Sequence, residues 1–538
     1  MSQIVQIASN AVTAKLFNAS REMRLEIMNT LSYAVAGAEY SGAFKHTGWD
    51  GRSTFYNFGS DTFPAGFVHL VRKKLERLGA KVQLVRKPLP APRGPVVSKI
   101  DAFGFDPRYD YQPETVDKLL RHGQIIAQIA TGGGKSRIAR LCYDRIRRTT
   151  LFLTTRGVLM HQMKDAFEED SGMSVGVLGD SEWSPKNGMN VGMVQTFMAR
   201  LKHFDKTAEL DRLRKKNTLG QKRAKETGVE FIVMNIADMR KLTNQKEKAH
   251  DKRREQTIAL LNKFEFVILE EAHEVGGDSY FDIMKHCKVA NYRLSLTATP
   301  FMRDSEADNM RLMACSGPVA IKVSEKLLID RGILAKPFFK YLEVVKPDRI
   351  YRSTPWQRAY KFGIVQAEYR NKQIAAEVIR AAKMGLTSMI LIQHKAHGEK
   401  LQKLISKYVR VEFIYGKHEQ RDRKAAIARL ANGEIDVLIG TTILDVGVDV
   451  PAVGVIILAG GGKAEVALRQ RIGRGLRCKK VGPNVAMIVD FSDETNTYLR
   501  DHAKQRRAIV ENTPGFGENI VPKGQDFDFA AMGFKVAA

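Results

Sequence analysis

The sequence predicts an α/β protein with two consecutive parallel-sheet domains, a small α/β domain in front of them and a helical, basic insertion. Short apolar segments of strand length alternate with helix-like patterns along most of the chain. This alternation is typical of parallel sheets with crossover helices. The length of 538 residues allows several such domains, since one domain usually takes about 100 to 200 residues.

Composition and charge point to a folded protein with a polyanionic partner. Hydrophobic residues make up 44% of the chain, enough for well-filled cores. The formal net charge of +27 favours nucleic acid over a membrane surface, with solubility alone as the alternative. The four cysteines are widely spaced and form no C-x-x-C pair, which argues against a disulfide framework and structural zinc. No secretory signal and no bilayer-length apolar run are visible, so we expect a cytoplasmic protein without a membrane partner.

The segment QIIAQIATGGGKS (124–136) has the pattern of a phosphate-binding loop. An apolar stretch of strand length is followed by three glycines and then by a lysine and a serine, where a helix-like pattern starts. Glycines let backbone N–H groups approach phosphate oxygens, the lysine would reach the β- and γ-phosphates, and the serine would hold Mg²⁺. Ile129 stands where the full pattern has glycine, so an ordinary glycine turn is the alternative. The expected nucleotide-binding residues are Thr131, Gly132, Gly133, Gly134, Lys135 and Ser136.

Residues 1–86 are predicted to form the small front domain. An alternating segment at 32–40 suggests a strand, 67–79 a helix and 81–85 a further strand. Trp49 and Arg52 flank a tight turn among other aromatic and basic residues, which suits stacking on bases and pairing with phosphates. The alternative for Trp49 is that it fills a small core. The proline-rich segment 87–99 is predicted to be a semi-rigid linker.

The two large domains are predicted over residues 100–336 and 337–495, followed by a basic helix and tail at 496–538. A charged insertion at 201–263 is expected to be mostly helical, with 231–235 as a possible extra strand. It favours contact with a phosphate backbone, the alternative being a solvated charged face. The strand candidates are 125–129, 151–154, 191–194, 266–269 and 292–296 in the first domain, and 389–393, 411–414, 436–439, 453–458 and 485–489 in the second.

Two further patterns carry chemistry. The apolar segment FVILEEAHE delivers Glu270 and Glu271 at the end of a strand candidate, where a parallel sheet places its active site. Glu270 is expected to hold Mg²⁺ through water, and Glu271 to orient and deprotonate an attacking water. Downstream, a helical pattern puts Gln470, Arg474 and Arg477 on one face, from which arginines can reach a γ-phosphate. A surface acidic pair and a solvated arginine stripe are the alternatives.

Taken in order, these motifs resemble those of superfamily 2 helicases over about residues 105–495. ATGGGKS resembles motif I, LTTRGVLMHQ motif Ia, VQTF motif Ib, EEAH motif II, TATP motif III, ILIQH motif IV, TTILDVGVDVP motif V and QRIGRGLR motif VI. The resemblance implies two RecA-like domains that bind ATP and Mg²⁺ between them. The family normally has Asp where this chain has Glu270. The resemblance further implies that Tyr111, Gln112, Gly447 and Asp449 bind nucleotide, and that Thr155, Arg156, Thr196 and Thr441 contact nucleic acid.

The front segment, with GWDGR before an aromatic strand and a PAGFVHLV helix, is similar to the front domain of phage UvsW-type helicases. This implies an ATP-hydrolysing DNA helicase that remodels branched or forked DNA in recombination, repair and replication, with other proteins of those processes as possible partners. It would act in the host cytoplasm if the source is a phage. Three alternatives stay open: a motor subunit of a restriction or defence complex, an RNA helicase, and a nucleotide-switched DNA clamp with little hydrolysis.

Overall fold

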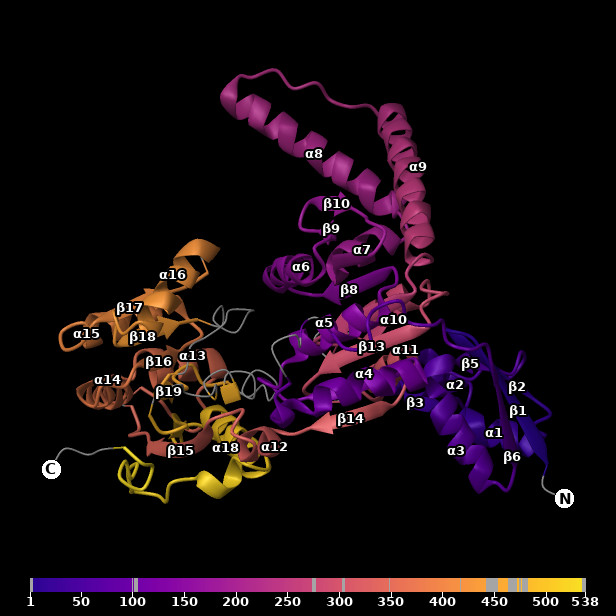
Figure 1. The fold of residues 1–538 in the computed structure, drawn as a ribbon. Helices are drawn as coiled ribbons and strands as arrows, with labels where there is room; N and C mark the ends of the chain where they lie inside the picture. Colours follow the sequence, from indigo (N-terminus) through magenta and orange to yellow (C-terminus); the bar gives the residue numbers. More distant parts are fainter. Residues whose placement is uncertain are drawn as a thin grey trace.

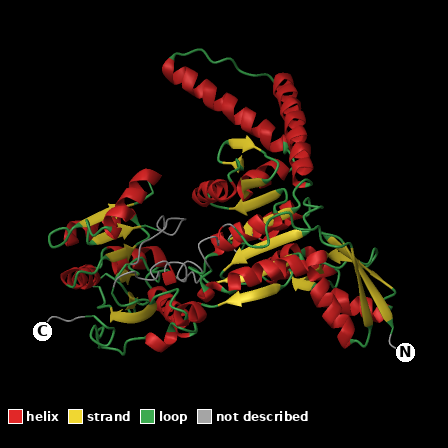
Figure 2. Cartoon of the chain, viewed as in Figure 1, coloured by secondary structure: helices red, strands yellow, loops and turns green. Residues whose placement is uncertain are grey.

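The computed structural model describes residues 3–98, 100, 105–272, 277–301, 305–347, 349–416, 418–441, 453–462, 472–473, 476 and 482–534. It confirms the predicted α/β class: an eight-stranded and a six-stranded sheet follow each other along the chain, after a four-stranded and a two-stranded sheet in front (Figures 1 and 2). None of the helices in this described part combines the length and the apolar character needed to cross a bilayer.

The front unit is built around a four-stranded sheet in the order β5-β2-β1-β6, with β3 and β4 paired separately. Helices α1 and α3 supply Ile27, Val71 and Leu75 to the same apolar cluster as Val5 and Ile7 of β1. The elements are β1 (Ile4–Ser9), β2 (Thr13–Phe17), α1 (Arg21–Thr30), β3 (Ser32–Ala34), η1 (Ala38–Tyr40), α2 (Gly42–His46), β4 (Arg52–Thr54), β5 (Thr62–Pro64), η2 (Ala65–Phe67), α3 (Val68–Arg77) and β6 (Lys81–Arg86).

The front unit packs directly on the first large sheet domain. Its apolar cluster includes Ala314 and touches Met310 and Met313, all three on helix α11 (Glu306–Ser316). At Gly66 a Cβ would lie 2.2 Å from the carbonyl oxygen of Met313, so only glycine permits this approach. The proline-rich segment is also bonded to the large domain: Tyr292 donates to the Pro90 carbonyl at 2.7 Å.

The first large domain has the strand order β10-β9-β11-β8-β12-β13-β7-β14. All pairs are parallel except that of β9 with β10. The strands are β7 (Gln124–Ile129), β8 (Thr150–Thr154), β9 (Gly176–Gly179), β10 (Glu182–Ser184), β11 (Met189–Met193), β12 (Phe266–Glu270), β13 (Tyr292–Thr297) and β14 (Val319–Val323). The helices are η4 (Pro107–Tyr109), α4 (Tyr111–His122), α5 (Lys135–Ile146), α6 (Gly157–Ser171), α7 (Val194–Leu201), α10 (Gly277–Met284), α11 and α12 (Glu325–Asp330).

Helices cover both faces of this sheet, which explains its apolar strands. Ile125, Ala127 and Ile129 of β7 face one apolar cluster, together with residues of α4, α5 and α6. Ile126 of the same strand faces the other cluster, with residues of α7, α10 and α11. A sheet buried on both faces is the usual setting of parallel strands.

The charged insertion forms two helices, α8 (Lys206–Thr227) and α9 (Ile236–Leu261), that project from the first domain and are joined at their outer ends by a loop (Figure 1). The predicted helical character is therefore correct. The extra strand suggested at 231–235 is wrong, because these residues lie in that loop. Their backbone pairs with a side chain instead: Asn217 on α8 exchanges two hydrogen bonds with the backbone of Met234.

A second expectation also needs correction. The segment 32–40 is a strand only over Ser32–Ala34, and it continues as a 3₁₀ turn over Ala38–Tyr40. Gly37 adopts a left-handed conformation with φ of +73°, which ends the extended backbone. The alternating apolar pattern here reflects a turn packed against the unit and not one long strand.

The second large domain has an entirely parallel sheet in the order β15-β20-β19-β16-β18-β17. Its elements are β15 (Lys336–Glu343), α13 (Trp356–Tyr360), a π-helical turn (Lys361–Val365), α14 (Glu368–Lys383), β16 (Ser388–Leu391), α15 (Lys395–Ile405), β17 (Val411–Ile414), α16 (Gln420–Ala431), β18 (Val437–Gly440), β19 (Val455–Ile457) and β20 (Val485–Ser492). The basic helix predicted after it is α18 (Thr497–Glu511), followed by η7 (Gly517–Asn519). The tail packs back on this domain through the buried side chains of Phe516, Phe527 and Met532.

Candidate nucleotide site between two sheet domains

The glycine loop lies between strand β7 and helix α5, as the pattern predicts. Gly132 and Gly134 have φ of +87° and +80°, a conformation that strains residues with a Cβ. Ile129, which replaces the usual glycine, is fully buried. Its Cγ2 lies 2.6 Å from where a Cβ on Gly133 would stand. The isoleucine therefore packs against Gly133 on the buried side of the loop.

Two side chains of α4 contact the buried part of this loop. The Tyr111 hydroxyl donates to the Gly133 carbonyl at 2.8 Å, and the Gln112 amide lies 3.4 Å from the same oxygen. Both residues are buried, and burial raises the pKa of Tyr111. Tyr111 therefore stays a neutral hydrogen-bond donor. Together, Tyr111 and Gln112 hold the glycine loop in position.

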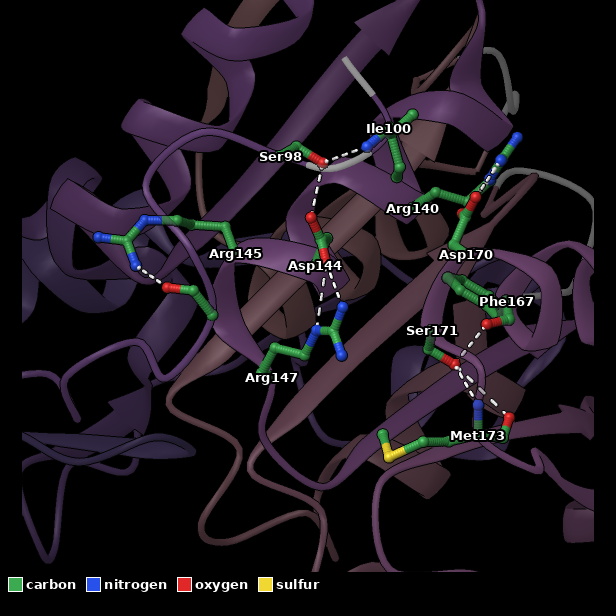
Figure 3. A network of polar contacts seen from close by, with 11 residues as sticks. Ser98, Ile100, Arg140, Asp144, Arg145, Arg147, Phe167, Asp170, Ser171 and Met173 are labelled. Atoms are coloured by element: carbon green, nitrogen blue, oxygen red, sulfur yellow. Dashed lines mark hydrogen bonds and ion pairs between the residues drawn. The ribbon is translucent and has the colours of Figure 1, made fainter. Parts of the chain in front are cut away.

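The helix that follows the loop is anchored by polar contacts from its middle to its C-terminal end (Figure 3). Asp144, buried on α5, accepts hydrogen bonds from Ser98 at 2.6 Å and from the Nε of Arg147 at 3.1 Å. Arg140, also on α5, forms an ion pair with Asp170 of α6. These contacts anchor the middle and the C-terminal half of α5 to the segment before it and to the helix after it.

The two carboxylates follow from strand β12, whose neighbours in the sheet are β8 and β13. Glu270 ends β12 and is only 4% exposed. The hydroxyl of Tyr280 donates to its carbonyl at 2.9 Å. Glu271 comes directly after the strand, and its Oε1 lies 3.6 Å from Nζ of Lys135. The parallel sheet thus brings Lys135 and Glu271 together at the carboxyl ends of its strands.

The backbone of Glu271 is unusual. Its φ is +46°, in the left-handed region that costs a residue with a side chain on the order of 1 kcal/mol or more. Such strain persists only where the surroundings over-determine the conformation, as they often do at functional sites. It turns the chain sharply after β12 and accompanies the approach of Glu271 to Lys135.

The second domain reaches this site from the opposite side. A Cβ on Gly473 would lie 2.7 Å from the Cβ of Thr131, so this glycine of the second domain is seated against the glycine loop. Nearby, Ala335 donates its backbone N–H to the Leu476 carbonyl at 2.6 Å. Five of the predicted site residues lie outside the described residues: Gln470, Arg474, Arg477, Gly447 and Asp449.

The predicted nucleic-acid contacts fall into separate groups. Thr155 and Arg156 follow β8, and Thr196 lies on α7 after the adjacent strand β11. All three are partly exposed, and Gln195 donates to the Thr155 carbonyl at 3.0 Å. Thr441 belongs to the second domain, where it follows β18 and is 8% exposed.

The turn of the front unit is tied to the large domain. The indole N–H of Trp49 donates to the Arg52 carbonyl at 2.6 Å. The indole is partly exposed and is absent from the apolar cluster of the unit, so it does not fill that core. The Arg52 guanidinium forms an ion pair with Glu306 at 3.3 Å. Glu306 begins α11 and also accepts from the backbone of Ala34 at 2.9 Å. Sequence reasoning missed this glutamate because no local pattern marks it.

Two family models match the chain. Residues 106–302 match "Type III restriction enzyme, res subunit", and residues 371–479 match "Helicase conserved C-terminal domain". Together they cover more than half of the chain. Two parallel-sheet domains that meet at a glycine loop have the architecture of RecA-like nucleotide-binding proteins. More particularly, the chain belongs to the superfamily 2 helicases, whose helicase domains imply the use of ATP.

Curated relatives are distant and mostly longer. Putative helicase 22 of Sulfolobus islandicus filamentous virus is 22% identical over 53% of this chain and 51% of its own length. The DNA 3'-5' translocase XPB2 of Sulfurisphaera tokodaii is 22% identical over 69% of this chain and 78% of its own. The chain spans 41% of the yeast putative ATP-dependent helicase IRC3, at 26% identity over 50% of this chain, so it covers about half or less of two of these relatives.

One solved structure supports the fold at low sequence identity, and a second aligns over most of the chain. The helicase MrfA bound to DNA and AMPPNP has a TM-score of 0.50 at 13% identity, over 79% of this chain and 55% of MrfA. The UvsW protein of T4 has a TM-score of 0.42 at 18% identity, over 97% of this chain and 99% of UvsW.

Proposed function

We propose that this protein is an ATP-dependent DNA helicase or translocase that remodels branched DNA, by branch migration and fork regression, in recombination, repair and replication. One observation carries the motor part of this proposal. Lys135 and Glu271 meet at the carboxyl ends of the parallel strands of the first sheet. Gly473 of the second domain is seated against the same glycine loop. A site built by both domains lets nucleotide binding change their relative position.

The residues at this site fit ATP and Mg²⁺. The glycine loop has the conformation that lets backbone N–H groups approach phosphates, and the exposed Ser136 lies in the first turn of α5. Ser136 and the buried carboxylate of Glu270 are hard oxygen ligands, the type that Mg²⁺ takes. When bound, the metal would offset the negative charge of the phosphates.

The remaining roles follow the same geometry. Lys135 would bind the outer phosphates, and Glu271 would take the proton of the attacking water. Tyr111 and Gln112, already bonded to the loop, would contact the adenine. The second domain would contribute Gly447, Asp449, Gln470, Arg474 and Arg477, with the two arginines acting on the γ-phosphate in the transition state.

The proposal that DNA is the partner rests on the charge of the chain and on its sequence similarity to a DNA translocase. The net charge of +27 suits a polyanion, and XPB2, which aligns with 69% of this chain, is a DNA translocase by name. Thr155, Arg156, Thr196 and Thr441 would contact the backbone of the strand. Such contacts go mainly to phosphates, which suits movement that does not depend on sequence.

Branched DNA as the substrate rests on the front unit. Trp49 presents a partly exposed indole beside Arg52, and Arg52 is paired with Glu306 at the start of α11. Because α11 follows the TATP segment (297–300) closely in the chain, DNA held at Trp49 would be coupled to the motor through this ion pair.

A second candidate is a motor subunit of a restriction complex. It is favoured by the description of the family model that matches residues 106–302. Such a subunit would share the ATP site and would act on plain duplex DNA, without a preference for junctions.

The test is ATP hydrolysis by the full-length protein with a four-way junction, a plain duplex, single-stranded DNA and RNA, combined with strand separation of the junction. The proposal requires DNA-stimulated turnover and junction processing that Trp49→Ala impairs more than duplex-stimulated turnover. Equal activity on duplex and junction would favour the restriction motor, and stimulation by RNA alone an RNA helicase. DNA binding that responds to nucleotide with little turnover would favour a switched clamp.

A further inference from the structure

The outer end of the helical arm displays aliphatic side chains to solvent. The exposed residues are Leu219 in the outer half of α8, Val229, Ile232 and Val233 in the loop, and Ile236 at the start of α9, and Ile232 is 88% exposed. We call these five residues the aliphatic tip. The arm projects from the first domain (Figure 1), and because these aliphatic side chains are exposed they contribute nothing to a core. Exposed apolar patches generally mark interaction sites.

The loop that carries the tip has a defined conformation. The Asn217 side chain donates to the Met234 carbonyl at 2.7 Å and accepts from its N–H at 3.2 Å. The ring of Phe231 packs over Gly220, where a Cβ would lie 2.2 Å from the ring. Phe231 and Met234 therefore take the inward positions of the loop. Ile232 and Val233, which lie between them in sequence, are left pointing outward.

A groove with basic side chains adjoins the tip. It has a volume of about 650 Å³ between α8 and the loop, and Leu219, Val229 and Phe231 form part of its lining. Its cationic lining residues are Arg212, Lys215, Lys216 and Arg223, against one carboxylate, Glu230. Within the part of the chain that the structure describes, Lys215, Lys216 and Arg223 form no ion pair, whereas Arg212 is paired with Glu209. The groove thus offers positive charge that the fold itself does not neutralise.

The root of the arm adjoins the predicted path of the nucleic acid. Helix α9 packs against α7, the helix that carries Thr196, and Arg254 of α9 donates to the Leu201 carbonyl at the end of α7 at 2.9 Å. A nucleic-acid strand bound at Thr196 would therefore lie close to the base of the arm. This placement favours nucleic acid over an acidic protein as the occupant of the groove.

We propose that the arm is a wedge for branched nucleic acid, in which the basic groove holds the phosphate backbone and the aliphatic tip inserts against bases at the branch point. The proposal rests on the function proposed above and assigns a site that the motor motifs do not include. Aliphatic side chains at the point of contact with DNA are known to enter base steps and unstack them, while neighbouring cations hold the backbone. Unstacking a base step costs free energy, so a wedge that binds the unstacked bases lowers the work left to the motor.

The experiment uses forked DNA with 2-aminopurine at the branch point, bound to the full-length protein without ATP, so that a rise in fluorescence reports unstacking. The test variant carries Ile232→Ser and Val233→Ser. The control carries Val96→Ser and Val97→Ser, which remove two valines that are 84% and 77% exposed elsewhere on the surface. A third protein, Lys135→Ala, has a disabled motor and an intact arm.

The wild type, the valine control and Lys135→Ala should all raise the fluorescence, and the tip variant should lose most of the rise. With ATP, the tip variant should lower the ratio of fork opening to single-strand-stimulated ATP turnover by about tenfold. A tip variant with full fluorescence and an unchanged ratio would overturn the wedge, and the tip would then be assigned to a protein partner. A wild type without DNA-stimulated turnover would instead overturn the proposed motor, a result that the fluorescence assay separates from the wedge.

Discussion

The ammonium group of Lys135 and the carboxylate of Glu271 lie 3.6 Å apart, with side chains that are 9% and 12% exposed. The lysine begins α5, directly after the glycine loop, and the glutamate directly follows β12. Poorly screened by water, each charge stabilises the other in the absence of nucleotide. Incoming phosphates would compete with Glu271 for the lysine, which would release the carboxylate for its proposed role as a base.

Replacing Lys135 by alanine should reduce ATP turnover by at least about a hundredfold, since a positioned cation at the phosphates acts mainly in the transition state. DNA binding measured by anisotropy should stay close to wild type, because Lys135 lies at the proposed nucleotide site and is not among the residues proposed to contact DNA. Turnover within a few-fold of wild type would show that this loop is not the phosphate site.

Glu271→Gln should lower turnover by about a hundredfold or more while ATP still binds, because the amide keeps the shape but cannot accept a proton. Single-turnover hydrolysis and equilibrium binding of ATP separate the two effects. Retention of most of the DNA-stimulated turnover would remove Glu271 from the catalytic role and support the nucleotide-switched clamp.

Glu270→Asp restores the residue that superfamily 2 helicases normally carry at this position. We expect a neutral or mildly activating effect on turnover, because coordination of Mg²⁺ through water tolerates a change in ligand length. The measurement is turnover as a function of Mg²⁺ concentration. A lower rate with a higher Mg²⁺ requirement would mean that this site is built around the longer glutamate.

Gly473→Ala should slow turnover because its Cβ would lie 2.7 Å from the Cβ of Thr131. Overpacking of this kind costs about 1 to 3 kcal/mol, and here it opposes the approach of the two domains. Gly42→Ala is the matched control, since a Cβ there meets no atom closer than 4.0 Å. The idea fails if both variants hydrolyse ATP at the wild-type rate with wild-type KM.

Removing positive charges from α8 should reduce the salt dependence of DNA binding, and the size of the reduction should depend on which charges are removed. Lys215→Gln with Lys216→Gln should flatten the slope by up to about 0.9 log unit per lost duplex contact. Arg212→Gln with Arg214→Gln should flatten it less, because these arginines are already paired with Glu209 and Asp211. Binding constants across a salt series test this, and equal, unchanged slopes would favour a solvated charged face.

Acid should destabilise the second domain through His397. This buried histidine touches Asn371 at 2.9 Å, and its pKa is lowered to about 3 by burial and by the nearby charge of Arg370. The unfolded chain has a pKa near 6.5, so the histidine's contribution to stability is full above pH 6.5 and is lost as pH falls toward 3. At pH 5 the loss is on the order of 2 kcal/mol.

The histidine effect is isolated by comparing melting temperatures of wild type and His397→Gln from pH 7 to pH 5. Glutamine can keep a hydrogen bond to Asn371 and does not titrate. The wild type should lose more stability than the variant over this interval, and parallel curves would contradict the assignment.

Several features of the fold and site follow from local sequence. The glycine loop between β7 and α5, and the glutamates at the end of β12, were predictable because strand, turn and helix signals lie next to each other in the chain. Short or partly polar strands at a sheet edge or next to one carry little local signal. Hence β9, β10 and β14 of the first sheet, and β15 of the second, have no counterpart among the strand candidates.

By itself, the sequence determined which residue types stand at the ends of which strands, and so the chemistry available at the site. Only the tertiary structure decided which of these ends meet. Strand order places β12 and β7 on either side of β13, which brings Glu271 to Lys135. Packing of the front unit on α11 likewise brings Glu306 to Arg52, 254 residues away in the chain. Such contacts depend on how buried surfaces fit together, and no local pattern encodes that fit.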